Sequence, residues 1–272
     1  MAVSVASVGD NCVDRYVDPP GLTEPGGNAL NVAVHVAAAG VECAYLGIVS
    51  ADSDGRLLLA AARAAGVDVS GVEVRPDGHT GVTVVRIADG ERIFESERYG
   101  VAADIRLNGM VLDRAATHDW VHATRVSEVA AGLAELRARG VPTSYDLGEG
   151  PDETLIEATC RHLDIAFASA PDTDAADLAR ILLDAGARAA VVTRGADGAL
   201  AANAVAVVEL PAADVRVVDT LGAGDALIGA YIAAAVRGAD LNQALAAGTL
   251  AAGETCTHVG AWAAALAERE AS

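Results

Sequence analysis

The chain of 272 residues contains no lysine, so all 19 of its basic residues are arginine. Acidic residues number 38, and the formal net charge is −19 at pH 7. Such an acidic chain repels polyanions, which argues against nucleic acid or an anionic membrane surface as a partner. The lack of lysine also excludes a Walker A phosphate loop, because that motif requires a lysine after its second glycine.

Aromatic residues are scarce as well, at 3% of the chain, whereas apolar residues reach 52%. The core must therefore be built from alanine, valine and leucine, which suits close packing of helices on a sheet. The four cysteines form no CxxC pair and indicate no disulfide framework. No apolar run approaches the ~18 residues of a membrane-spanning helix, and the first residues lack a secretory pattern. We expect a cytoplasmic protein.

Strand-like and helix-like segments alternate along most of the chain. Helices are predicted at 29–39 and 54–65, each followed by a glycine that favours a helix end. Buried strands are predicted at 2–8, 44–49, 120–123, 143–146, 165–169 and 189–193. This alternation predicts an α/β fold with a doubly wound, mostly parallel sheet and helices on both faces.

A hairpin interrupts the alternation early in the chain. The segments Thr80–Ile87 and Arg92–Tyr99 flank Asp89-Gly90, which is a strong signal for a tight turn. The hairpin could cover a binding site, or it could be a surface hairpin that contacts a second subunit.

The segment Asp219-Thr220-Leu221-Gly222-Ala223-Gly224-Asp225 precedes a long apolar stretch and predicts a glycine turn that opens a helix. The glycines allow a ligand to approach the backbone, and the free N–H groups of Gly222–Gly224 attract an anion. Asp225 then lies in the first turn, where it could act as a base or only cap the helix. An anion cradle beside a base is what phosphoryl transfer to a hydroxyl requires. A dinucleotide fingerprint is excluded, because Leu227 occupies the place of its third glycine.

This segment resembles the carboxy-terminal signature of the PfkB/ribokinase family of carbohydrate kinases. Three further elements follow the family's order and spacing: Val8–Asp14, Pro25–Ala33 and Val191–Gly198. The resemblance implies a ribokinase-like fold in which residues 1–272 form one kinase domain. It also implies a small β lid over the sugar, made from segments at about 15–24 and 79–99. Such a lid would exclude water that competes for the phosphoryl group.

Shorter stretches resemble the fructoselysine 6-kinase branch of that family, which acts on fructosamine (Amadori) compounds. They are Gly9–Asp14, Gly26–Ala29, Ala166–Pro171 and Gly260–Trp262. The resemblance implies ATP-dependent phosphorylation of a primary hydroxyl, with Mg²⁺ as cofactor. A fructosamine phosphorylated at O6 is the first candidate substrate. The alternatives are a ribokinase-like or fructokinase-like enzyme for a plain sugar, and a non-catalytic sugar- or nucleotide-binding sensor. The intact Asp225 and its glycines argue against the sensor.

The resemblance also implies roles for individual residues. Asp225 would be the general base, and the amides of Gly222, Ala223 and Gly224 would form the anion hole. The candidate sugar ligands are Asp10, Asn11, Asp14, Gly26, Gly27, Asn28 and Asn31. Aspartate and asparagine together supply the donors and acceptors that sugar hydroxyls require. Asn28 stands where ribokinase carries lysine, which counts against ribose as the substrate. A turn at Asp10 and a helix cap at Asn28 are the structural alternatives.

Nucleotide and metal roles follow from the same resemblance. The nucleotide-binding candidates, which could also form a plain β-turn, are Thr193, Arg194, Gly195 and Gly198. Asp219 matches a monovalent-cation ligand, which makes K⁺ a candidate cofactor. The family's Asn-x-x-Glu element, associated with Mg²⁺, is replaced by Ser169–Asp172, so Asp172 would keep the acidic role and Asp146 is a second candidate.

Lid residues are expected to set the substrate, and the candidates are Arg92, Phe94, Arg98 and Tyr99. A lid arginine would pair with the carboxylate of a substrate that bears an amino acid. The lid could also join two subunits in a homodimer.

Overall fold

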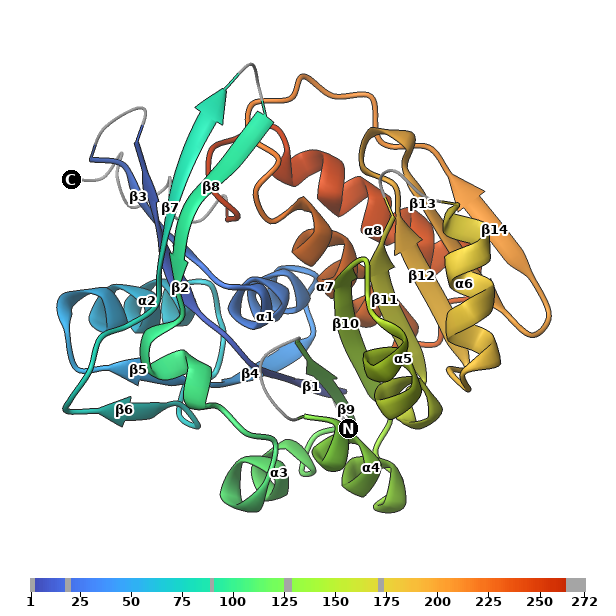
Figure 1. The fold of residues 1–272 in the computed structure, drawn as a ribbon, viewed down its shortest axis with the longest axis horizontal. Helices are drawn as coiled ribbons and strands as arrows, with labels where there is room; N and C mark the ends of the chain where they lie inside the picture. Colours follow the sequence, from blue (N-terminus) through green and yellow to red (C-terminus); the bar gives the residue numbers. More distant parts are fainter. Residues whose placement is uncertain (1–2, 18–20, 89–90, 125–128, 171–173, 263–272) are drawn as a thin grey trace.

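An eight-stranded sheet runs through the centre of the computed structural model, which describes residues 3–17, 21–88, 91–124, 129–170 and 174–262 (Figure 1). Its strand order is β14-β13-β12-β11-β10-β9-β1-β4. From β12 to β4 all neighbours are parallel, whereas β13 and β14 add an antiparallel edge. The strands are β1 (Ser4–Val8), β4 (Glu42–Leu46), β9 (Trp120–Ala123), β10 (Thr143–Glu149), β11 (Ile165–Ser169), β12 (Ala189–Thr193), β13 (Ala199–Asn203) and β14 (Val207–Leu210).

Helices cover both faces of this sheet. One face packs against α1 (Asn28–Ala38), α2 (Ser53–Ala64), α7 (Ala223–Ala235) and α8 (Leu241–Thr255). The other packs against α3 (Gly109–Ala115), α4 (Ala130–Ala138), α5 (Glu153–Thr159) and α6 (Ala175–Asp184). Short 3₁₀ turns lie at η1 (Gly100–Asp104), η2 (Cys160–His162) and η3 (Gly195–Asp197).

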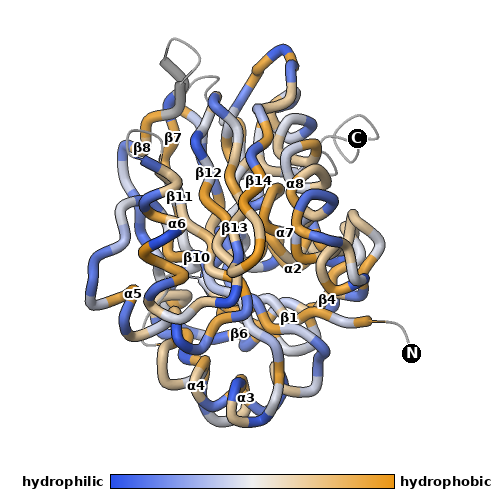
Figure 2. Tube along the Cα trace, turned by 90° about the vertical axis from the view of Figure 1, so that its right-hand side faces the viewer, coloured by the Kyte–Doolittle hydropathy of each residue, from blue (hydrophilic) through white to orange (hydrophobic). Residues whose placement is uncertain are grey.

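Each face has its own apolar cluster of mostly alanine, valine and leucine, with few aromatic rings. Figure 2 shows the hydrophobic segments gathered along the central strands. The predicted α/β fold with a mostly parallel sheet between two helical layers is therefore confirmed. None of the helices in the described part of the chain is long and apolar enough to cross a membrane.

The strand expected at 44–49 is two strands in the structure. It breaks at Gly47, after which β5 (Ile48–Ser50) turns away and pairs with β6 (Glu73–Arg75). A side chain at Gly47 would place its Cβ 2.0 Å from the hydroxyl of Tyr45, so only glycine fits here. The break lets the chain leave the large sheet, and the hydropathy pattern carried no sign of it.

A second sheet of four strands forms the expected small β lid. Its order is β3-β2-β7-β8, with the strands β2 (Cys12–Tyr16), β3 (Thr23–Gly26), β7 (Val82–Ala88) and β8 (Glu91–Arg98). Only three residues separate the carboxyl end of β1 from the start of β2, so the lid starts at the edge of the large sheet where the parallel strands end. The antiparallel pairing of β7 and β8 confirms the predicted hairpin.

Asp52 links the lid to the helical layer. Its carboxylate caps α2 by accepting from the amide of Gly55 at 2.8 Å, and it also accepts from the amide and the hydroxyl of Thr80 at 2.8 and 2.7 Å. Burial opposes ionisation of Asp52, but these hydrogen bonds outweigh it and lower the pKa of the carboxyl. Thr80 lies two residues before β7, so the lid hairpin is anchored at its base.

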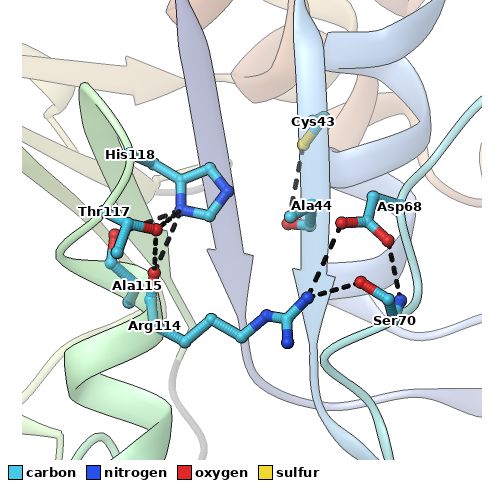
Figure 3. A network of polar contacts seen from close by, with 8 residues as sticks. All are labelled: Cys43, Ala44, Asp68, Ser70, Arg114, Ala115, Thr117 and His118. Carbon is cyan, nitrogen blue, oxygen red and sulfur yellow. Dashed lines mark hydrogen bonds and ion pairs between the residues drawn. The ribbon is translucent and has the colours of Figure 1, made fainter.

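Away from the lid, Arg114 of α3 contacts Asp68 and Ser70 in the loop that follows α2, and this contact is called the Arg114 clip (Figure 3). Its guanidinium donates to the hydroxyl of Ser70 and lies 3.8 Å from the carboxylate of Asp68. Hydrogen bonds from Ser70 lower the pKa of Asp68, which keeps the ion pair charged. None of the candidate site residues belongs to this clip, so its role is structural.

Candidate active site

A pocket of about 280 Å³ opens between the lid, the start of α1 and the start of α7. This volume is close to the lower end of the range of about 300–1,000 Å³ for small-molecule sites. Its lining residues are Asp10, Cys12, Asp14, Gly27, Asn28, Asn31, Thr83, Phe94, Glu97, Arg98, Tyr99, Leu221, Gly222, Gly224 and Asp225. Eight of the residues singled out as base, anion hole or sugar ligands thus meet in one place.

The start of α7 forms one wall of the pocket. Gly222 adopts φ +76°, and a Cβ there would lie 2.4 Å from the Cβ of Ala261, so the turn requires glycine. Gly224 has no atom within 4 Å of the position of a Cβ, which leaves its backbone open to a ligand. The amide of Ala223 donates to the carbonyl of Thr220 at 3.3 Å, and Ala223 does not line the pocket. The open part of the anion cradle is therefore at Gly222 and Gly224.

Asp225 lies in the first turn of α7 and faces the pocket. Its Oδ2 accepts a hydrogen bond of 2.7 Å from Nδ2 of Asn31, a residue of α1. The Oδ1 of Asn31 in turn accepts from the indole N–H of Trp262 at 2.7 Å. Because Trp262 fixes which way the Asn31 amide points, the amide always presents its NH₂ group to Asp225. The carboxylate is thereby oriented from outside its own helix.

Asp10 caps the start of α1. Its oxygens accept from the amides of Asn28 and Ala29, both at 3.1 Å, and from the hydroxyl of Thr124 at 3.1 Å. The helix cap falls to Asp10, rather than to Asn28 as considered from the sequence. Asp10 also lines the pocket, so its carboxylate neutralises this helix end while remaining beside the site.

Asn28 lines the pocket, whereas two other candidate sugar ligands, Asn11 and Gly26, do not. Nδ2 of Asn28 donates to Oδ2 of Asp146 at 2.7 Å, which links the middle of β10 to the start of α1. Asn11 does not line the pocket: it is 1% exposed, and its amide donates to the hydroxyl of Tyr45 and the carbonyl of Ile48. Gly26 also lies outside the lining, and a Cβ there would be 2.0 Å from the carboxylate of Asp14.

The inner face of the lid carries a row of acidic side chains. Glu24 opposes Asp14, Asp14 opposes Thr83, and Thr83 opposes Glu97 across the four strands. Opposed residues point to the same face of a sheet, so these four side chains share one face. The row contains three carboxylates, one hydroxyl and no cation.

A bulge in β8 shapes the rest of this face. Ser96 opposes Val84 but Phe94 opposes Val85, so one extra residue is inserted between them. The insertion turns Phe94 to the same side as Glu97, and both line the pocket together with Arg98 and Tyr99. Of the lid residues expected to set the substrate, only Arg92 has a side chain that is outside the described part.

The nucleotide-binding candidates form a separate turn between β12 and β13. Thr193 ends β12 and donates to the hydroxyl of Ser169 at 3.1 Å, and Arg194 pairs with Glu209 at 2.9 Å. Gly195 has φ +58° and open space around it. Gly198 differs, because a Cβ there would lie 2.1 Å from the carbonyl oxygen of Leu210, so glycine is required for packing. None of the four lines the pocket, but the turn lies at the carboxyl end of β12.

The carboxylate of Asp219 is engaged by protein donors. Oδ1 accepts from the amide of Leu221 at 2.9 Å, and Oδ2 accepts from the amide of Gly260 at 3.0 Å and the hydroxyl of Tyr16 at 2.5 Å. This geometry does not support a monovalent cation on that carboxylate. Asp172 lies outside the described residues, and within them no group of three or more His, Cys, Asp or Glu could hold a metal.

Sequence reasoning missed four contributors to the site: Cys12, Tyr16, Thr83 and Glu97. Thr83 and Glu97 reach the site because of the register in which the lid strands pair, and this register cannot be read from the sequence of one strand alone. Tyr16 contacts Asp219, which is 203 residues away in the sequence. Only the alternation Cys12-x-Asp14-x-Tyr16, which puts these side chains on one face, was a signal that could have been followed.

Comparison with known proteins agrees with this geometry. Residues 21–116 and 154–267 match the pfkB family carbohydrate kinase domain. The fructoselysine 6-kinase of Escherichia coli (strain K12) is 35% identical over 95% of this chain and 99% of its own. A fructosamine kinase of Bacillus subtilis (strain 168) is 31% identical over 96% and 93%.

Solved structures show the same fold. The ribokinase of Thermotoga maritima superposes with a TM-score of 0.81 at 20% identity, and the match covers 97% of this chain and 96% of that one. The predicted ribokinase-like architecture is thus confirmed. The chain belongs to the pfkB family of carbohydrate kinases and is an enzyme that phosphorylates a sugar with ATP.

Proposed function

We propose that this kinase phosphorylates a ketoamine sugar (a fructosamine such as fructoselysine) at its primary hydroxyl, with Asp225 as the general base. The observation that carries the proposal is the charge of the pocket. Among the described residues that line it, four are carboxylates and one, Arg98, is an arginine. This excess of negative charge favours the protonated amine of a ketoamine over a neutral sugar.

The chemical step follows from the start of α7. Asp225 takes the proton of the primary hydroxyl as that oxygen forms a bond to the γ-phosphorus of ATP, and the bond from phosphorus to the ADP oxygen breaks. The hydrogen bond from Asn31 holds the Asp225 carboxylate in place where it faces the pocket, and therefore beside the substrate hydroxyl. The backbone at Gly222 and Gly224, at the positive end of the helix, stabilises the charge on the transferring group.

ATP would enter the reaction with Mg²⁺, which would neutralise part of the phosphate charge. The open space at Gly224 and at Gly195 fits the close approach of phosphates to backbone. We assign the phosphate end to Gly224 and the rest of the nucleotide to the turn Thr193–Gly198. The chain then works as one kinase domain, 1–272, in which the lid closes on the sugar and keeps water out.

The lid supplies the contacts that separate a ketoamine from a plain sugar. With the primary hydroxyl at Asp225, the opposite end of the sugar points to the lid. Asp14 is buried and suits the sugar hydroxyls, while Glu97 is exposed at the pocket mouth and suits the ammonium group. Arg98 follows Glu97 and is also exposed, so it can pair with the carboxylate of an attached amino acid.

Replacement of the base gives a direct test of the catalytic assignment. We expect Asp225→Asn to lower kcat by at least about a thousandfold, because the amide cannot accept the proton, while the affinity for ATP changes little. Coupled measurement of ADP release gives kcat, and calorimetric titration gives the affinity. Asp240→Asn is the control, because Asp240 caps α8 and does not line the pocket, and this variant should keep the wild-type kcat. Near-normal turnover by Asp225→Asn would contradict the role of Asp225.

Glu97 tests the substrate class. Glu97→Gln should raise the KM for fructoselysine about tenfold, equivalent to about 1.4 kcal/mol, and leave the KM for fructose within about twofold. Glu95→Gln is the matched control, since Glu95 lies on the same strand but pairs with Arg86 and does not line the pocket. Arg98→Ala should raise the KM for fructoselysine but not for a fructosamine that lacks a carboxylate. Equal changes for fructose and fructoselysine in Glu97→Gln would exclude the ammonium contact.

The lid also supports a proposed homodimer. β8 is an edge strand, and it exposes Ile93 at 49%, while Tyr99, the residue after the strand, is 50% exposed. Apolar side chains on an exposed sheet edge are typical of a surface that pairs with another chain. Light scattering after size-exclusion chromatography should give the mass of two chains for the wild type and of one chain for Ile93→Glu. A monomeric wild type would exclude the dimer.

A further inference from the structure

Tyr16 connects the lid to the loop that carries the anion cradle. It ends β2, its side chain is 3% exposed, and its hydroxyl donates to Oδ2 of Asp219 at 2.5 Å. Asp219 lies three residues before Gly222. This contact joins a strand of the lid to the loop between β14 and α7, 203 residues further along the chain.

Asp219 passes the contact on to the cradle. Its Oδ1 accepts from the amide of Leu221, the residue directly before Gly222, and this fixes the direction in which the turn begins. Its Oδ2 also accepts from the amide of Gly260. Ala261 then packs against Gly222, and the next residue, Trp262, donates to Asn31. One carboxylate therefore lies between the lid, the glycine turn and the segment that orients the base.

An apolar contact supports the same link. Tyr16, Val85 and Leu221 form a small buried cluster, so both lid strands β2 and β7 pack on the residue before the cradle. Burial raises the pKa of Tyr16 far above its ordinary value, and the hydrogen bond and charge of Asp219 raise it further. The hydroxyl is therefore a permanent donor, and it offsets the charge of a carboxylate that would otherwise repel a nearby phosphate.

We propose that Tyr16 is a positioning residue: its hydrogen bond to Asp219 holds the Gly222–Gly224 turn in its productive geometry only while the lid is in place. This inference rests on the proposed function, since it assumes that the turn receives the phosphoryl group. It explains how lid closure over the sugar affects the geometry of the glycine turn at the other side of the pocket. Transfer to water before closure is thereby suppressed.

Tyr16→Phe removes only the hydroxyl and keeps the ring in its apolar cluster. We expect kcat to fall about tenfold or more, because a hydrogen bond to a charged group is lost, while the KM for ATP and the melting temperature change little. The ratio of ADP released to sugar phosphate formed should rise above one. Tyr231→Phe is the control, since Tyr231 is a buried tyrosine of α7 that packs on Phe167 away from the lid. Its kcat and its ratio should equal those of the wild type.

A double-mutant cycle makes the test specific to this hydrogen bond. Asp219→Asn should lower kcat on its own, and the double variant Tyr16→Phe with Asp219→Asn should be no slower than the slower single variant. Additive effects would overturn the proposal. So would a Tyr16→Phe enzyme with wild-type kcat and ratio, or one whose kcat falls only together with its melting temperature. Failure of the proposed function is recognised separately, as turnover that survives Asp225→Asn.

Discussion

The hydrogen bond between Asn31 and Asp225 joins the starts of α1 and α7, and the candidate site depends on that junction. Both helix ends carry partial positive charge, yet the structure treats them differently. At α1, Asp10 accepts from the first amides and neutralises the end, which leaves a polar surface suited to sugar hydroxyls. At α7, the backbone of Gly224 is left open, which suits a phosphate. The proposed placement of the sugar at α1 and of the phosphates at α7 follows from which helix start is capped by a carboxylate.

Around this junction, the lid and the segment Gly260–Trp262 act as two clamps. The segment touches Asp219, Gly222 and Asn31 in turn, so three consecutive residues hold the cation-site candidate, the cradle and the partner of the base. The lid brings its acidic row and Tyr16 to the same place from the other side. The absence of lysine is consistent with the proposed function, which assigns the anion to backbone groups and the sugar to carboxylates and amides.

Much of this arrangement could be predicted from residues that carry strong local signals. The glycine turn before α7, the glycine after α1 and the Asp89-Gly90 hairpin each dictate their backbone locally, and the structure has the helices and strands expected there. The break at Gly47, the bulge in β8 and the edge strands β13 and β14 were not predictable, since they depend on close approaches and on pairing register. For the same reason the sequence predicts Asn11 as a sugar ligand, whereas in the structure its amide donates to Tyr45, which lies on another strand.

The central claim is that this acidic pocket accepts a sugar that carries an amine. The most direct measurement is the initial rate of ADP release by the wild-type enzyme with Mg-ATP and, in parallel, fructoselysine, a fructosamine without a carboxylate, fructose and ribose. The account predicts a kcat/KM for both fructosamines that exceeds the value for either plain sugar by at least about tenfold. A kcat/KM for fructose or ribose equal to or above that for the fructosamines would contradict it.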